Sequence, residues 1–184
     1  METGYITKAD PKEEGETVSL KIPNREIASI FEDTVVAYFK NTANASELNH
    51  LIHALWEGDE AEASRLISSL LWYTISYNDY HEDYYHAFLA GIFVGRGYNV
   101  ESNREKGLGR PDLLLKDKRN RRAIIIEAKK SKREADMIKD CEKAIDQIIT
   151  GKYAEGLYGY TQVSCYGISF FQKQARVMKR SDEK

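Results

Sequence analysis

The sequence contains only two cysteines, and it lacks any apolar run of the roughly twenty residues that a membrane-spanning helix requires. Cys141 and Cys165 are far apart, form no C-x-x-C motif and follow no recognisable secretory leader. We therefore expect a reduced, cytoplasmic protein without a membrane segment. His50 and His53 have no cysteines nearby, so a helix surface explains them better than a zinc site does.

A net positive charge is also missing, since the chain carries a formal charge of −2. The distribution is uneven: residues 96–133 contain thirteen Lys or Arg against five Asp or Glu, a local +8, whereas residues 1–95 contain six against sixteen. A basic segment is typical of binding to a phosphate backbone, although a charge run is more often only a solvated face. The composition alone therefore leaves nucleic-acid binding open.

Two short motifs lie inside this basic segment. Asp112 follows Pro111 and precedes three leucines, and Glu127-Ala128-Lys129 follows the apolar run 123–126. The charged residues between them are typical of a turn, so the pattern predicts a β-hairpin that returns Glu127 to the level of Asp112. Strand alternation then places Glu127 and Lys129 on one face and Ala128 on the other.

Carboxylates that converge with a lysine can hold a divalent cation and stabilise negative charge on a phosphodiester. Hard oxygen ligands favour Mg²⁺ or Mn²⁺ over zinc, and the backbone carbonyl of Ala128 is a further candidate ligand beside Asp112 and Glu127. Each motif alone is common, and the alternative is an exposed strand end with a solvated Glu-Lys pair. Charges at the ends of apolar strands favour the metal site, because near a core they need partners or a metal.

Upstream, residues 80–95 have apolar positions at helical spacing. Glu82 and His86 lie four residues apart, on one face of that helix, where either is a candidate metal ligand or water-orienting group. Glu82 also suits the helix N-terminus electrostatically. A core histidine that binds a backbone carbonyl is an equally good interpretation of His86.

Three segments together resemble the PD-(D/E)xK nuclease superfamily: residues 84–91 (YYHAFLAG), 101–112 (ESNREKGLGRPD) and 125–129 (IIEAK). They resemble most the branch found behind AAA-type ATPase-like domains. The resemblance implies a restriction-endonuclease-like α/β (α+β) fold, with an αβββαβ core around a central mixed sheet. It also implies metal-dependent cleavage of nucleic acid, with Asp112, Glu127 and Lys129 in the catalytic positions.

Residues 135–150 are predicted to form a helix that Gly151 ends. Similar nucleases carry a glutamine and often a tyrosine after the E-x-K strand to position substrate or water. The resemblance therefore implies Gln147 as a fourth catalytic residue and Tyr153 as a candidate substrate contact. An exposed helix amide and a packing aromatic are their ordinary roles. The candidate contacts to the nucleic-acid backbone are Arg110, Lys130, Lys132, Arg133 and Tyr153.

The acidic N-terminal region is predicted to be a separate, mostly helical part. Residues 4–7 and 17–22 fit two short strands, and residues 25–40 fit an amphipathic helix. Asn44 and Asp59 are candidate caps of two more helices. At 184 residues, the chain is long enough for one domain with an appendage, which we divide into residues 1–75 and a nuclease domain over residues 76–180.

These observations predict a Mg²⁺- or Mn²⁺-dependent phosphodiesterase acting on DNA, although the sequence does not distinguish DNA from RNA. Because the resembling proteins carry an ATPase module ahead of this region, we expect an ATPase domain in the same full-length protein. Apolar surface left without that neighbour is expected to favour a homodimer. The competing hypothesis is a catalytically silent domain that binds nucleic acid or protein and regulates the attached ATPase.

Overall fold

The computed structural model describes residues 7–8, 20–21, 45–74, 82–102 and 111–180. Its helices are α2 (Ala45–Glu57), α3 (Glu60–Thr74), α4 (Glu82–Gly95) and α5 (Met137–Thr150), with a 3-10 turn η1 (Glu134–Asp136) before α5. Its strands are β1 (Thr7–Lys8), β2 (Leu20–Lys21), β3 (Asn99–Ser102), β4 (Leu113–Asp117), β5 (Arg122–Lys130), β6 (Gln162–Phe171) and β7 (Gln174–Lys179).

Strands β3 to β7 form one mixed sheet in sequence order. β3, β4 and β5 are antiparallel neighbours, β5 and β6 are parallel, and β6 and β7 are antiparallel. The parallel pair is possible because η1, α5 and a loop carry the chain back to the start of β6. The order α4, β3, β4, β5, α5, β6 confirms the αβββαβ core that the resemblance implied.

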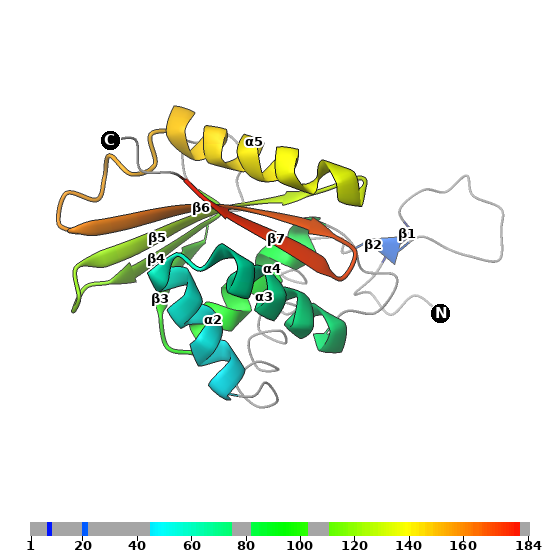
Figure 1. Cartoon of the computed structure of the whole chain (residues 1–184), viewed down its shortest axis with the longest axis horizontal. Coiled ribbons are helices and arrows are strands. Elements are labelled where there is room, and N and C mark those ends of the chain that lie inside the picture. The colour runs from blue at the N-terminus through cyan, green and yellow to red at the C-terminus, as the bar shows by residue number, and fades with distance from the viewer. Residues whose placement is uncertain (1–6, 9–19, 22–44, 75–81, 103–110, 181–184) are drawn as a thin grey trace.

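The sheet separates two layers of helices (Figure 1). Helix α5 covers one face, and α2, α3 and α4 lie on the other. The alternation of β5 matches this arrangement, since Ile124 and Ile126 join the core with α2, α3 and α4, whereas Ile125 packs in a second cluster with Ile148 of α5. The same alternation places Glu127 on the α5 face.

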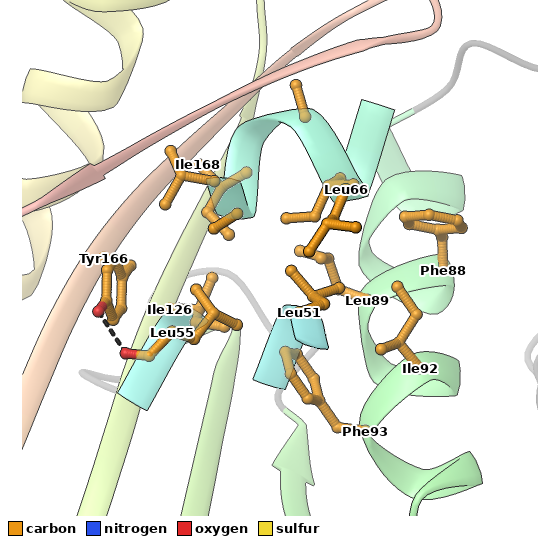
Figure 2. Packing of buried hydrophobic residues seen from close by; sticks show 14 of the residues in the cluster. Leu51, Leu55, Leu66, Phe88, Leu89, Ile92, Phe93, Ile126, Tyr166 and Ile168 are labelled. Atoms are coloured by element: carbon orange, nitrogen blue, oxygen red, sulfur yellow. Dashed lines mark hydrogen bonds between the residues drawn. The ribbon is translucent and has the colours of Figure 1, made fainter. Parts of the chain in front are cut away.

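The larger core lies between the sheet and the three helices (Figure 2). Leu51 and Leu55 of α2 and Phe88 of α4 are buried there together with Ile126 of β5. The hydroxyl of Tyr166 on β6 donates a hydrogen bond to the carbonyl of Leu55, so the sheet and α2 are also joined by a polar contact. The core is therefore continuous across residue 75, and the division of the chain there stays a prediction.

The N-terminal expectations fall partly within the described residues. β1 pairs antiparallel with β2, as the predicted hairpin requires. Asp59 caps α3, because its Oδ1 accepts the Glu62 amide at 2.9 Å. Gly58, with φ of 82°, separates α2 from α3. The predicted helix over residues 25–40 and the cap at Asn44 lie outside the described residues.

The ends of α5 differ in detail from the prediction. The helix was expected from Ala135, but Arg133 and Asp136 form an ion pair at 2.8 Å and a backbone hydrogen bond, which hold residues 134–136 in a 3-10 turn. At its other end Gly151 follows the helix as predicted, with an ordinary φ of −76°. A Cβ at Gly151 would lie 2.3 Å from the ring of Tyr153, so the glycine makes room for that ring.

Helix α3 covers the outer edge of β7, the last strand of the sheet. The amides of Ala175 and Val177 donate to the hydroxyls of Ser68 and Ser64 at 2.9 Å each, and the amide of Lys179 donates to Glu60 at 3.0 Å. The spacing of the acceptors on α3 matches the spacing of the amides on β7, because four helical residues rise about 6 Å and two strand residues rise about 6.6 Å. A sheet edge that would otherwise attract other strands is thereby hydrogen-bonded within the chain.

Replacing Ser64 and Ser68 by alanine is expected to lower the free energy of unfolding by about 1–3 kcal/mol for each amide left without an acceptor. Chemical denaturation measures this loss. Ser69→Ala on the same helix is the matched control, since no hydrogen bond of its side chain is found among the described residues. Equal stability of the double variant and the control would show that the two hydroxyls do not stabilise the edge.

Candidate active site

The candidate site lies where β4 begins and β5 continues past it. Leu113 pairs with Ile126, so the next positions outward are Asp112 and Glu127, as the predicted hairpin requires. The amide of Asp112 lies 3.3 Å from Oε2 of Glu127. The sheet register therefore brings the carboxylates of two separate motifs together at one strand end.

A second contact ties Asp112 to β5. Its Oδ2 accepts the backbone amide of Ala128 at 2.9 Å. In an antiparallel arrangement the N–H and C=O of one strand residue point to the same side, so the Ala128 carbonyl also faces the space beyond the end of β4. The Ala128 carbonyl therefore lies on the side of β5 that faces Asp112, as its predicted role as a backbone ligand of the metal requires.

Lys129 joins the carboxylate pair to α5. Its ammonium donates to Oε1 of Glu127 at 3.0 Å and to Oε1 of Gln147 at 2.6 Å. Strand alternation places Glu127 and Lys129 on the face that α5 covers, and Gln147 reaches them from that helix. Three of the four residues predicted to be catalytic are therefore in direct contact, and Asp112 adjoins Glu127.

His86 of α4 lies under the same strand end. It is 8% exposed, and its Nε2 donates to the backbone carbonyl of Asp112 at 2.9 Å. Of the two interpretations that the sequence left open, this contact is the one expected of a core histidine. The contact fixes the backbone that carries the Asp112 carboxylate. The side chain of Glu82, the other candidate from this helix, lies outside the described part of the chain.

The electrostatics of the site centre on Glu127, which is 2% exposed. Burial raises the pKa of Glu127 above its usual range, and the nearby charge of Asp112 raises the pKa further. Lys129 acts in the opposite direction, through its charge and its hydrogen bond. The Lys129 ammonium contacts the carboxylate of Glu127, so the pair of carboxylates carries a local excess of negative charge where both are ionised.

The donor set fits a hard divalent cation. Asp112 and Glu127 offer carboxylate oxygens, and Ala128 a carbonyl oxygen. Among the described residues, no group of three or more His, Cys, Asp or Glu side chains could hold a metal. Mg²⁺ commonly uses only one or two carboxylates and keeps several waters, so two carboxylates with a carbonyl suffice for it but not for a structural zinc site.

One polar contact beside the site was missed by the sequence analysis. Ser131 is 2% exposed, and its hydroxyl donates to Asp140 of α5 at 2.8 Å. Asp140 also accepts from Lys143 at 2.7 Å, and its pKa lies below its usual value, since these two hydrogen bonds outweigh the effect of burial. The available signal was strand alternation, since Ser131 follows Glu127 and Lys129 on the same face.

The predicted backbone-binding residues differ in their surroundings. Lys130 and Lys132 are exposed just after the site, and Arg133 is exposed but paired with Asp136. Tyr153 is half-buried against the second core cluster, which is the packing role open to it. Arg110 lies outside the described residues.

Comparison with known families decides what this arrangement belongs to. The family described as the PD-(D/E)XK nuclease superfamily matches residues 80–180, which is more than half of the chain. The chain belongs to the PD-(D/E)XK nuclease superfamily. A search of the curated proteins found no match to the sequence.

Members of the PD-(D/E)XK superfamily are generally phosphodiesterase nucleases that use divalent metals such as Mg²⁺. The matched span contains every candidate site residue. It also contains the P-D and E-x-K motifs from which the superfamily takes its name.

Within the described residues, no helix is long and apolar enough to cross a bilayer.

The raised pKa of Glu127 predicts a pH dependence of the metal-free PD-(D/E)XK domain. The unfolded chain has a glutamate pKa of about 4.3. A pKa raised in the folded state means that stability is lost as pH rises from that value through the folded pKa. Glu127→Gln removes this loss, so the variant should gain stability relative to wild type as pH rises in a chelator. Thermal unfolding at a series of pH values measures this difference in stability, and Glu155→Gln, at an exposed position, is the control. Parallel stability–pH profiles of wild type and Glu127→Gln would contradict the prediction.

Proposed function

We propose that this PD-(D/E)XK domain is a Mg²⁺- or Mn²⁺-dependent nuclease that hydrolyses phosphodiester bonds of DNA. The observation that carries the proposal is the contact of Asp112, Glu127 and Lys129 at one strand end. A buried glutamate beside a second carboxylate is costly for a purely structural strand end. A divalent cation would remove that cost by neutralising both groups.

Each residue has a distinct role in this proposal. Asp112 and Glu127 hold the cation, together with the Ala128 carbonyl, and Glu82 stays a candidate ligand. A bound divalent cation supplies Lewis-acid stabilisation of the charge on the phosphodiester. Lys129 orients the attacking water or stabilises negative charge that develops during in-line displacement.

Two further residues keep these groups in position. Gln147 accepts from the Lys129 ammonium at 2.6 Å and so holds it on the α5 side of the carboxylates. His86 holds the Asp112 backbone through its carbonyl and acts as a positioning residue. Catalysis of phosphoryl transfer depends on such fixed geometry, because small displacements of the reacting groups are costly in rate.

The basic side chains next to the site support an anionic polymer as substrate. Lys130 and Lys132 are exposed immediately beyond Lys129, and Arg133 follows them. Cations at this place can neutralise the phosphates that flank the cleaved bond. We assign Arg110 and Tyr153 to the same function on the basis of their positions in the sequence.

The wider context of the domain is also a proposal. The resemblance to proteins with an AAA-type ATPase-like module supports an ATPase domain in the same full-length protein. Two widely separated, buried cysteines without a disulfide support a cytoplasmic location. A homodimer remains a prediction, which measurement of the molar mass in solution tests.

Calorimetric titration of Mn²⁺ tests the proposed metal site directly. Wild type is expected to bind the ion, and Asp112→Ala is expected to lose that binding, because one of two carboxylate ligands is gone. Asp146→Ala, which removes an exposed carboxylate of α5, is the matched control. If wild type binds no Mn²⁺, or binds it no better than Asp112→Ala does, the nuclease proposal is contradicted and a silent interaction domain is favoured.

A panel of labelled substrates with Mn²⁺ then defines the substrate form. Single-stranded, duplex and branched DNA and an RNA of matched sequence should be incubated with the full chain. Cleavage of DNA is the expected result. Cleavage of RNA alone would refute DNA as the substrate while leaving the metal-dependent phosphodiesterase in place.

A further inference from the structure

The turn between β4 and β5 is held by its own side chains. Asp117 accepts the Asn120 amide at 3.1 Å, the Asn120 side-chain amide at 2.7 Å and Nε of Arg122 at 2.9 Å. These contacts lower the pKa of Asp117, although burial acts to raise it. The turn is thus a defined structure and not a loose charged loop.

The loop that follows α5 is fastened to this turn. Arg121 donates from Nε to the Gly159 carbonyl at 3.2 Å, and its own carbonyl accepts the Thr161 amide at 2.7 Å. Arg121 adopts a φ of 52°, a strained conformation for a residue with a side chain, and the contacts on both sides stabilise it. Two segments distant in sequence therefore present one joint surface.

This surface carries unpaired cations and an exposed aromatic ring. Lys118 and Arg119 are exposed in the turn, and neither has an ion pair within the residues that the structure describes. Tyr158, next to the fastened Gly159, is 91% exposed. We call Lys118, Arg119 and Tyr158 the tip cluster.

The tip cluster lies at the other end of β4 from the candidate active site. Asp112 adjoins the start of β4 and Asp117 ends it, so five strand steps, about 16 Å, separate the two ends. Between them the α5 face of the hairpin is lined by Leu114, which packs in one cluster with Leu157 and the half-buried Tyr153. The loop of the tip cluster therefore continues along the face that carries the site.

We propose that the tip cluster binds a single-stranded segment of the nucleic-acid substrate, about five nucleotides from the bond that is cleaved. This inference rests on the proposed function. Lys118 and Arg119 contact phosphates, and Tyr158 stacks on an unpaired base. The separation of about 16 Å between the two ends of β4 matches five nucleotides at about 3.4 Å each, the spacing along one strand of duplex DNA.

The chemistry favours nucleic acid over an acidic protein. An acidic peptide could form ion pairs with Lys118 and Arg119, but its carboxylates would not stack on the exposed ring of Tyr158. Unpaired bases stack on such a ring, and stacking tolerates any base. The loop that carries Tyr158 packs over Leu114 on the face that carries the candidate site, so one nucleic-acid strand can contact both the tip cluster and the site.

Binding without cleavage tests the tip cluster. Fluorescence anisotropy of labelled oligothymidylates of about 4 and about 12 nucleotides, with the full chain in EDTA, measures affinity against length and salt. Lys118→Gln with Arg119→Gln should reduce the salt slope for the longer strand by about 1.4, which is two single-strand phosphate contacts. Tyr158→Phe should bind like wild type, whereas Tyr158→Ala should bind at least about five-fold more weakly with an unchanged salt slope.

The matched control is Lys173→Gln with Arg176→Gln, which removes one cation of the turn between β6 and β7 and one cation of β7. An equal loss in the control pair would overturn the proposal, because general charge would then explain the binding. Competition by polyglutamate as effective as by the oligonucleotide, with no effect of Tyr158→Ala, would overturn it in favour of an acidic protein partner.

Cleavage assays on the same variants separate this inference from the proposed function. If wild type cleaves DNA but the tip variants bind like wild type at both lengths, the tip cluster is refuted and the nuclease stands. If wild type binds the longer strand through the tip cluster but cleaves nothing, the nuclease is refuted and the binding surface stands.

Discussion

Asp112→Asn is expected to reduce metal-dependent cleavage by about a thousand-fold or more, because it removes the charge of a metal ligand. The asparagine side chain retains an oxygen that can accept the Ala128 amide, as Oδ2 of Asp112 does at 2.9 Å. The strand end should therefore stay intact. Initial rates with saturating Mn²⁺ measure the loss, and circular dichroism confirms the fold.

Lys129→Met should cause a loss of similar size by a different route. Methionine keeps most of the length of the side chain but donates nothing to Glu127 or Gln147, which the lysine contacts at 3.0 and 2.6 Å. Mn²⁺ binding should persist in Lys129→Met and fail in Asp112→Asn, and this difference separates the two roles.

The control for both variants is Asp146→Asn on the exposed side of α5, which should cleave like wild type. If Asp112→Asn and Lys129→Met both retain full cleavage, the active site lies elsewhere in the chain.

Gly167→Ala is expected to destabilise the fold by at least about 1–3 kcal/mol, because α5 packs directly on the backbone of β6. A Cβ at this position would lie 2.3 Å from the carbonyl oxygen of Cys141 and 3.1 Å from Cβ of Ala144. The first neighbour is helix backbone, which cannot move aside alone. The helix as a whole must therefore shift away from the sheet.

The shift should also affect the site. Gly167 pairs with Glu127 across the parallel strands, and Gln147 lies on the helix that would move. Urea denaturation measures the stability loss, and cleavage by the folded fraction measures the effect on Lys129. Gly156→Ala is the control, since a Cβ there meets nothing within 4 Å and should change stability by less than about 0.5 kcal/mol. Equal stability of the two variants would refute the close packing of α5.

The sequence predicted the elements of the core because their signals are local. The apolar runs on either side of a charged turn specify a hairpin, and alternation within β5 assigns Glu127 and Lys129 to one face. The observed pairing of Leu113 with Ile126 confirms the register on which the prediction of converging carboxylates depended. The 3-10 turn before α5 was missed, because it depends on a contact between the Arg133 and Asp136 side chains.

Long-range contacts of single side chains could not be derived in this way. The sequence left His86 with two equal roles, and only the packing of α4 under β4 gives it the Asp112 carbonyl as a partner. The bonds from Ser64 and Ser68 of α3 to β7 join residues more than a hundred positions apart. Nothing local in the sequence distinguishes these serines from any other helical serines.

The sequence by itself determined the chemistry of the candidate site, because residue type and strand period decide which oxygens and which ammonium meet. Tertiary structure decided their environment. Burial under α5 raises the pKa of Glu127, Gln147 reaches Lys129 from that helix, and the loop after α5 brings Tyr158 to the turn at the far end of β4. These effects depend on how the helix and its loop lie on the sheet, which is set by packing across the core and not by any local pattern.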